Sequence, residues 1–245
     1  MIQGVSPDLP HLQELPPIKE WSLRIVKRPV SWVFRIMWRV RIHGEEHVPR
    51  RGAVILAANH IGFLDGPLLV AVTRRLSFAL AKDELFAGRL GRFFNHAGQI
   101  SVNRRQVDRL AISRCIQVLR ADKVLAVFPE GVRGAGEVTF AKGGAAYLAL
   151  VTGAPIVPVA ILGTREAGQH TSELPRRRGP IHVVFGSPLQ LPTAPWPRRK
   201  PVVADLTEQV RRHLAEHVIA AQTQTGLPLP GPPKPKPRPA DVRGA

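Results

Sequence analysis

The chain has 245 residues, 44% of them hydrophobic and 22% charged, and this composition excludes a wholly disordered or collagen-like polypeptide. Its 35 Lys and Arg residues against 18 Asp and Glu give a formal net charge of +17, which favours phosphate-bearing partners such as nucleic acid, anionic lipid or phosphorylated metabolites. The single cysteine, Cys115, excludes an internal disulfide and a thiolate zinc site, and it suits a reducing compartment.

Residues 1–18 form an N-terminal extension with two acidic residues and four prolines, and with no basic start followed by an apolar run. They are therefore not interpreted as a secretory signal. The longest uncharged stretch, 143–164, is long enough to cross a bilayer, but Gly153, Pro155 and Pro158 divide it into pieces too short for a spanning helix. We expect a soluble fold that can still sit on a membrane.

Residues 19–43 mix large apolar side chains with arginine and lysine, and they contain three of the four tryptophans. Pro29 is expected to divide this segment into two short helices, each with an apolar side and a cationic side. Such helices can lie in the headgroup plane of a membrane, where each basic residue near anionic lipid contributes about 1 kcal/mol. The alternative is a helix pair that covers the core and turns its basic side to solvent.

From Gly52 onward the chain alternates apolar strand patterns with helix patterns, which predicts, for the domain 44–225, an α/β fold with a mostly parallel central sheet flanked by helices. The expected strands are 53–57, 76–80, 99–102, 124–128, 155–161 and 181–185. The expected helices are 67–73, 83–95, 106–119, 143–152 and 202–221. The tail, 226–245, contains seven prolines and several basic residues, and it is predicted to be disordered or transiently extended.

Residues 59–65 follow an apolar strand and precede a helix, the place where open α/β sheets bind ligands. His60 and Asp65 would point about 140° apart on a regular helix, so they meet only if the segment turns, and the nearby glycines and proline favour a turn. A carboxylate that accepts one imidazole N–H leaves the other nitrogen free to remove a hydroxyl proton. The pair is a candidate general base with its orienting group. The alternative is a strand-end histidine followed by a helix N-cap.

Further polar groups follow other expected strands. The sequence Phe-Pro-Glu-Gly at 128–131 is followed by Arg133 and then by Lys142, directly before a glycine pair that opens an Ala-rich helix, and Arg104 follows the strand at 99–102. Cations beside a Gly-rich helix start can bind phosphate, because guanidinium groups bind it bidentately and free backbone N–H groups add donors. Taken singly, each of these residues is equally well interpreted as a turn or a surface charge.

In their order along the chain, four blocks resemble the PlsC-type glycerolipid acyltransferases: 59–65, 98–104, 128–133 and 154–160. The resemblance covers about 52–164. It implies transfer of a fatty acyl group from acyl-CoA or acyl carrier protein to a lysophospholipid hydroxyl, most often that of lysophosphatidic acid, which yields phosphatidic acid. Glycerol 3-phosphate or another lysolipid is the alternative acceptor. The implied setting is the cytoplasmic face of the cell membrane, peripherally bound, without a metal or organic cofactor.

The resemblance also implies residue roles, with His60 as the base and Asp65 as its orienting group. The implied substrate-binding residues are Asn59, Arg104, Glu130, Gly131, Arg133 and Lys142. Gly62 departs from the family pattern, in which serine is frequent at that place. Because no Gly-x-Ser-x-Gly elbow occurs and Cys115 falls inside an expected helix, direct attack by the acceptor is expected instead of an acyl-enzyme.

Two other functions fit parts of the sequence. The first is a non-catalytic protein of the same fold that binds anionic membranes. The second is nucleic-acid binding, suggested by the net charge and by the basic clusters at 176–178 and 198–200. No reader motif is recognised and the aromatic residues lie away from those clusters, so no specific nucleic-acid partner is expected.

Overall fold

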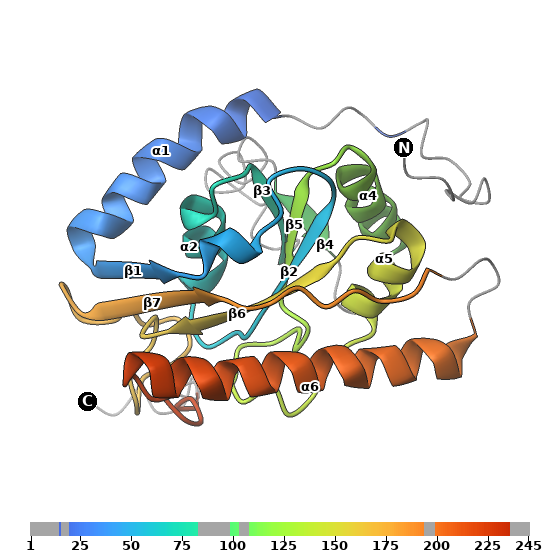
Figure 1. The fold of residues 1–245 in the computed structure, drawn as a ribbon. Helices are drawn as coiled ribbons and strands as arrows, with labels where there is room; N and C mark the ends of the chain where they lie inside the picture. Colours follow the sequence, from blue (N-terminus) through green and yellow to red (C-terminus); the bar gives the residue numbers. More distant parts are fainter. Residues whose placement is uncertain (1–14, 16–19, 83–98, 103–107, 194–198, 236–245) are drawn as a thin grey trace, which may run out of the picture.

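The computed structural model describes residues 15, 20–82, 99–102, 108–193 and 199–235. Within them the chain forms a seven-stranded sheet in the order β1-β7-β6-β2-β5-β3-β4 (Figure 1). The strands are β1 (Arg39–His43), β2 (Val54–Ala58), β3 (Ser77–Lys82), β4 (Ile100–Val102), β5 (Val124–Val127), β6 (Ile156–Leu162) and β7 (Pro180–Phe185). All neighbours pair in parallel except β6 and β7, which confirms the expected fold class.

The helices form two layers, one on each face of the sheet. They are α1 (Glu20–Met37), α2 (Asp65–Val72), α4 (Arg109–Arg120), α5 (Gly144–Thr152) and α6 (Lys200–Thr225), with a short 3₁₀ helix, η2 (Glu45–His47). α1 packs on α2, whereas α5 packs on both α4 and α6. Right-handed crossovers explain the layers, because the chain moves along the sheet in one direction through α2 and returns in the other through α4 and α5. The expected helix 83–95 lies outside the described residues.

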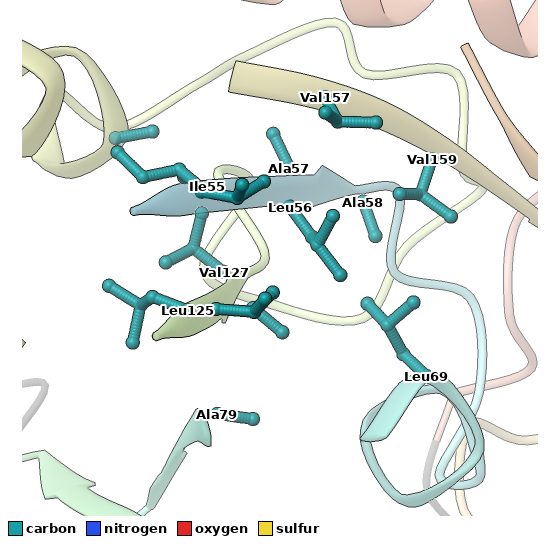
Figure 2. Packing of buried hydrophobic residues seen from close by; sticks show 14 of the residues in the cluster. Ile55, Leu56, Ala57, Ala58, Leu69, Ala79, Leu125, Val127, Val157 and Val159 are labelled. Carbon is teal, nitrogen blue, oxygen red and sulfur yellow. The ribbon is translucent and has the colours of Figure 1, made fainter. Parts of the chain in front are cut away.

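The core is centred on β2 and β6, in which every residue is buried. Strands covered on both faces are expected to be continuous apolar runs, and both strands have that character. Figure 2 shows Leu69 of α2 pointing toward the side of the sheet that carries Ala58 and Val159, which are paired in register. The labelled side chain of Leu69 therefore places α2 against the sheet near the carboxyl end of β2.

The N-terminal segment differs from the expected pair of short helices. α1 runs unbroken through Pro29, and the residues after it form strand β1, which pairs with β7. Leu23 and Phe34 are buried on either side of the proline, and Lys27 donates hydrogen bonds to the carbonyls of residues 73–75 at the end of α2. These contacts outweigh the one backbone hydrogen bond that a proline removes. Among the described helices, none combines the length and apolarity needed to cross a bilayer.

The tail also differs from its prediction, because residues 226–235 are ordered; we call them the C-terminal strap. Pro230 is buried, the Leu229 N–H donates to Gln222 Oε1 at 3.0 Å, and the Lys234 N–H donates to the Gln169 carbonyl at 3.2 Å. Prolines restrict the unfolded segment, so docking it costs less conformational entropy. Residues 236–245 lie outside the described part of the chain. The other expected strands and helices that fall within it are present, with ends shifted by a few residues.

Candidate active site

The site lies at the carboxyl ends of three adjacent parallel strands, β6, β2 and β5. His60 follows β2, Phe128 and Glu130 follow β5, and Thr164 follows β6. Parallel pairing brings these strand ends to one edge of the sheet. From β2 the chain crosses to β3 on one side of β2, whereas from β5 it crosses to β6 on the other side. Ligands of open α/β sheets bind at the carboxyl edge where the crossovers change direction in this way.

His60 and Asp65 meet as predicted, because the chain turns between them. His60 Nδ1 lies 2.8 Å from Asp65 Oδ2, and the same oxygen accepts the backbone N–H groups of Ile61 at 2.7 Å and Gly62 at 2.8 Å. Asp65 Oδ1 accepts the Thr164 hydroxyl. Asp65 is fully buried, yet its carboxylate is hydrogen-bonded on both oxygens, as burial of such a group requires. The N-cap residue of α2 is Leu64, so the N-cap alternative for Asp65 is wrong.

The rest of His60 is held by the chain that follows β5. Its N–H donates to Glu130 Oε1 at 2.8 Å, and its carbonyl accepts the Gly134 N–H at 2.8 Å. Its ring stacks on Phe128 with the centroids 4.2 Å apart. Since Asp65 orients Nδ1, Nε2 is the nitrogen available to take a proton.

Asn59 has a different place from the one expected. It has no exposed surface, and its amide donates to the Ile161 carbonyl at 3.1 Å and accepts the Ile161 N–H at 2.7 Å. The side chain therefore joins the end of β2 to β6 and supports the residue before His60. Both polar atoms of the amide are engaged inside the protein, so in this arrangement the side chain presents no polar group to a substrate.

The other expected substrate-binding residues surround the same edge. The pKa of the Glu130 carboxyl is raised to about 7, chiefly by burial; the His60 N–H opposes this shift, and the charge of Asp65 adds to it. The Lys142 side chain lies against Gly131, where an added Cβ would be 2.8 Å from Lys142 Cε. The Arg133 guanidinium lies 5.4 Å from the centroid of the Phe63 ring, and burial lowers its pKa. Arg104 lies outside the described residues.

Two residues that sequence reasoning missed, Thr164 and Arg165, complete the site. Arg165 is 2% exposed, and its guanidinium donates to the carbonyls of Ile61 at 2.8 Å, Gly134 at 2.9 Å, Gly231 at 2.6 Å and Gln169 at 3.3 Å. Burial lowers its pKa, and the negative charge of Asp65 opposes that shift. The only local signal for these two residues is a Thr-Arg pair after an apolar strand, and this pair does not indicate which carbonyls Arg165 binds.

The departure at Gly62 has a steric cause. A Cβ at this position would lie 2.8 Å from the backbone oxygen of Thr164, closer than a real Cβ contact. A serine therefore cannot enter without a shift of the backbone after β6. In this chain the backbone at Thr164, after β6, occupies the space that a side chain at position 62 would need.

An apolar cavity of about 470 Å³ lies beside the site, on the side of the sheet covered by α4 and α5. Phe128 lines it and also stacks on His60, so one ring separates the imidazole from the cavity. Cys115 also lines it, and burial raises the pKa of this thiol to about 12, which keeps it protonated at neutral pH. No group of three His, Cys, Asp or Glu side chains within the described residues could hold a metal ion.

The fold and the site define an α/β protein with a histidine–aspartate pair at the carboxyl edge of its mostly parallel sheet. The sequence model of the Acyltransferase family matches residues 39–162, about half of the chain. The chain therefore belongs to this family, whose PlsC-type members its motifs resemble. The match begins at β1 and ends at β6, so it covers the three strands that build the site.

The chain is also similar to individual proteins. An uncharacterised protein of Mycobacterium tuberculosis is 35% identical over 58% of this chain, and the chain spans 42% of that relative's length. The 1-acyl-sn-glycerol-3-phosphate acyltransferase of Borreliella burgdorferi is 34% identical over 51% of this chain and 52% of its own. That of Bacillus subtilis is 27% identical over 72% and 87%. The crystal structure of PlsC from Thermotoga maritima, at 23% identity, covers 84% of this chain and 79% of its own with a TM-score of 0.57, which shows a shared fold.

Proposed function

We propose that this protein transfers a fatty acyl group from acyl-CoA or acyl carrier protein to the free hydroxyl of a lysophospholipid, converting 1-acyl-glycerol 3-phosphate to phosphatidic acid. The observation that carries the proposal is the His60–Asp65 contact, made at an edge where a cavity and cationic groups converge. The acceptor is proposed from the names of the Borreliella and Bacillus relatives. The acyl donor is a co-substrate, and the proposed reaction needs no resident cofactor.

In the proposed mechanism, His60 Nε2 removes the proton of the acceptor hydroxyl while that oxygen adds to the thioester carbonyl. The Asp65 carboxylate accepts a hydrogen bond from the Nδ1–H group and stabilises the imidazolium that forms. The tetrahedral intermediate then breaks its carbon–sulfur bond, and the imidazolium proton neutralises the departing thiolate. An ester and a thiol leave, and His60 is neutral again. A base placed in this way contributes about 10²- to 10⁴-fold in rate.

The proposal also assigns substrate contacts to the neighbouring groups. In the proposal, the cavity behind Phe128 takes an acyl chain, because Leu80, Ile112 and Leu148 line it. Arg133 and Lys142 bind phosphate groups of the acceptor or the donor, as Arg104 is proposed to do. Glu130 acts by holding the His60 backbone, with which it makes its hydrogen bond.

We also propose that α1 docks the protein peripherally on anionic lipid at the cytoplasmic face of the membrane. Trp21, Ile25, Trp32 and Ile36 are 61%, 63%, 70% and 53% exposed. At about 100° per residue they form one stripe, opposite the buried Leu23 and Phe34. Arginines 24, 28 and 35 flank this stripe and are exposed. An outward apolar stripe beside a row of cations is the pattern of helices that lie in the headgroup region.

The test is an acyl-transfer assay with labelled palmitoyl-CoA and palmitoyl acyl carrier protein. The acceptors are lysophosphatidic acid, glycerol 3-phosphate and lysophosphatidylglycerol. We expect phosphatidic acid from the wild type, and a loss of about 10²- to 10⁴-fold in His60→Ala and Asp65→Asn. His170→Ala is the control, because His170 is a partly exposed loop histidine whose ring bonds to Ser172. Equal rates in all four proteins would show that His60 and Asp65 take no part in catalysis. Vesicle binding without turnover would favour the alternative, a non-catalytic protein that binds anionic membranes.

A further inference from the structure

Arg165 connects three segments that are far apart in the sequence. Its Nε donates to the Ile61 carbonyl in the turn after His60, and its Nη2 donates both to Gly134 in the loop after β5 and to Gly231 in the C-terminal strap. The side chain is buried, and these bonds run to backbone carbonyls. A buried guanidinium needs such acceptors, so losing the strap would leave part of it unpaired.

The path from the strap to the proposed base is short. The Gly134 carbonyl accepts a hydrogen bond from Arg165 Nη2, while the Gly134 N–H donates one to the His60 carbonyl at 2.8 Å. The same Nη2 atom lies 2.6 Å from the Gly231 carbonyl. The strap is therefore linked to the His60 backbone through one guanidinium nitrogen and one glycine.

Apolar contacts run beside these hydrogen bonds. Gly136 is buried with φ +91°, and a Cβ on it would lie 2.4 Å from Ile61 Cγ2 and 2.9 Å from Leu229 Cδ2. Leu229 and Ile61 thus occupy the space that a side chain at 136 would need. Because hydrogen bonds to Gln222 and Gln169 hold the strap at Leu229 and Lys234, its central part is fixed over the loop.

We propose that the C-terminal strap is a positioning element of the active site, and that Arg165 is the positioning residue through which it holds the His60 turn. This inference rests on the proposed acyl transfer. A displacement of about 1 Å of a catalytic group can cost about 10²-fold in rate. The prolines of the strap fit this role, since a restricted segment loses little entropy when it docks.

The test uses the full chain with three substitutions: Arg165→Lys, which keeps the charge but loses the planar fork, Leu229→Ala, and Lys234→Ala as control. Lys234 is exposed and bonds to Gln169 through its backbone, so its side chain is not needed for the strap to dock. The measurements are kcat and KM for lysophosphatidic acid and palmitoyl-CoA, together with amide hydrogen exchange. We expect Arg165→Lys and Leu229→Ala to lower kcat at least 10-fold with both KM values within about twofold.

Exchange gives a second readout that does not depend on turnover. The amides of Gly134, Leu229 and Lys234 should be protected in the wild type and in the control, and should exchange faster in Leu229→Ala while β2 stays protected. Unprotected Leu229 and Lys234 amides in the wild type would overturn the proposal, as would a released strap with an unchanged kcat. If the wild type transfers no acyl group, the proposed function fails, and exchange at Gly134 still decides whether the strap holds the turn. Should Arg165→Lys not fold, Leu229→Ala carries the test alone.

Discussion

The hydroxyl of Thr164 donates a hydrogen bond to Oδ1 of Asp65, which ties the start of α2 to the end of β6 across 99 positions of the chain. The other oxygen, Oδ2, is hydrogen-bonded to His60 Nδ1 and to the backbone N–H groups of Ile61 and Gly62. The two oxygens thus have different partners, and the Thr164 contact restricts rotation of the carboxylate. Orientation of the imidazole therefore depends on a strand that carries neither member of the pair.

Replacing Thr164 with valine should weaken both stability and acyl transfer. Valine has nearly the same shape but no hydroxyl, so Asp65 Oδ1 loses a buried donor, at a cost of about 1–3 kcal/mol. We expect urea unfolding to show a loss of this size and kcat to fall by about 10-fold. Thr164→Ser keeps the donor and is expected to retain most of both. A valine variant with wild-type stability and rate would show that the contact does not position Asp65.

Glu130 should make stability depend on pH in a defined window. Its folded-state pKa of about 7 lies above the ordinary value of 4.5, so the folded protein retains this proton to higher pH than the unfolded chain. The stabilising contribution is complete below pH 4.5 and is lost as the pH rises through 7. Urea unfolding at pH 5, 6, 7 and 8 should therefore show the wild type losing stability relative to Glu130→Gln up to about pH 7, then no further change. Glutamine keeps an oxygen for the His60 N–H but does not titrate, so a constant difference between the two proteins would contradict the assignment.

Substitutions in the exposed apolar stripe of α1 should weaken membrane binding selectively. Trp32→Ala and Ile25→Ala each remove an exposed apolar side chain, and burial of such a side chain contributes about 1.5–3 kcal/mol. Flotation with phosphatidylglycerol vesicles should show at least a 10-fold weaker partition for each variant, with little change in unfolding free energy. Leu110→Ala is the matched control, since Leu110 is 62% exposed but lies on α4. Equal losses in all three variants would mean that no particular face docks.

Much of the architecture is written locally in the chain. The apolar runs of β2, β5 and β6 have no charged residue and end at polar or turn residues, so their place in the sheet follows from composition over a few positions. The meeting of His60 and Asp65 is equally local, because only four residues separate them and one of these, Gly62, favours a turn. Glu130, Gly131, Arg133 and Lys142 could be assigned to the same edge, because each comes after a strand that ends there.

The remaining features depended on contacts that have no local signal. Pro29 indicates a helix break, yet α1 continues because α2 and the sheet hold it on both sides of the proline. Proline content alone indicates disorder in the strap, yet a buried guanidinium 66 positions earlier supplies the partner that its backbone needs. The sequence by itself determined the strands from β2 to β7 and the candidate base, since periodicity and turns act over a few residues. Only the tertiary structure decided what holds that base in place, because Thr164 and Arg165 reach partners 99 and 104 positions away.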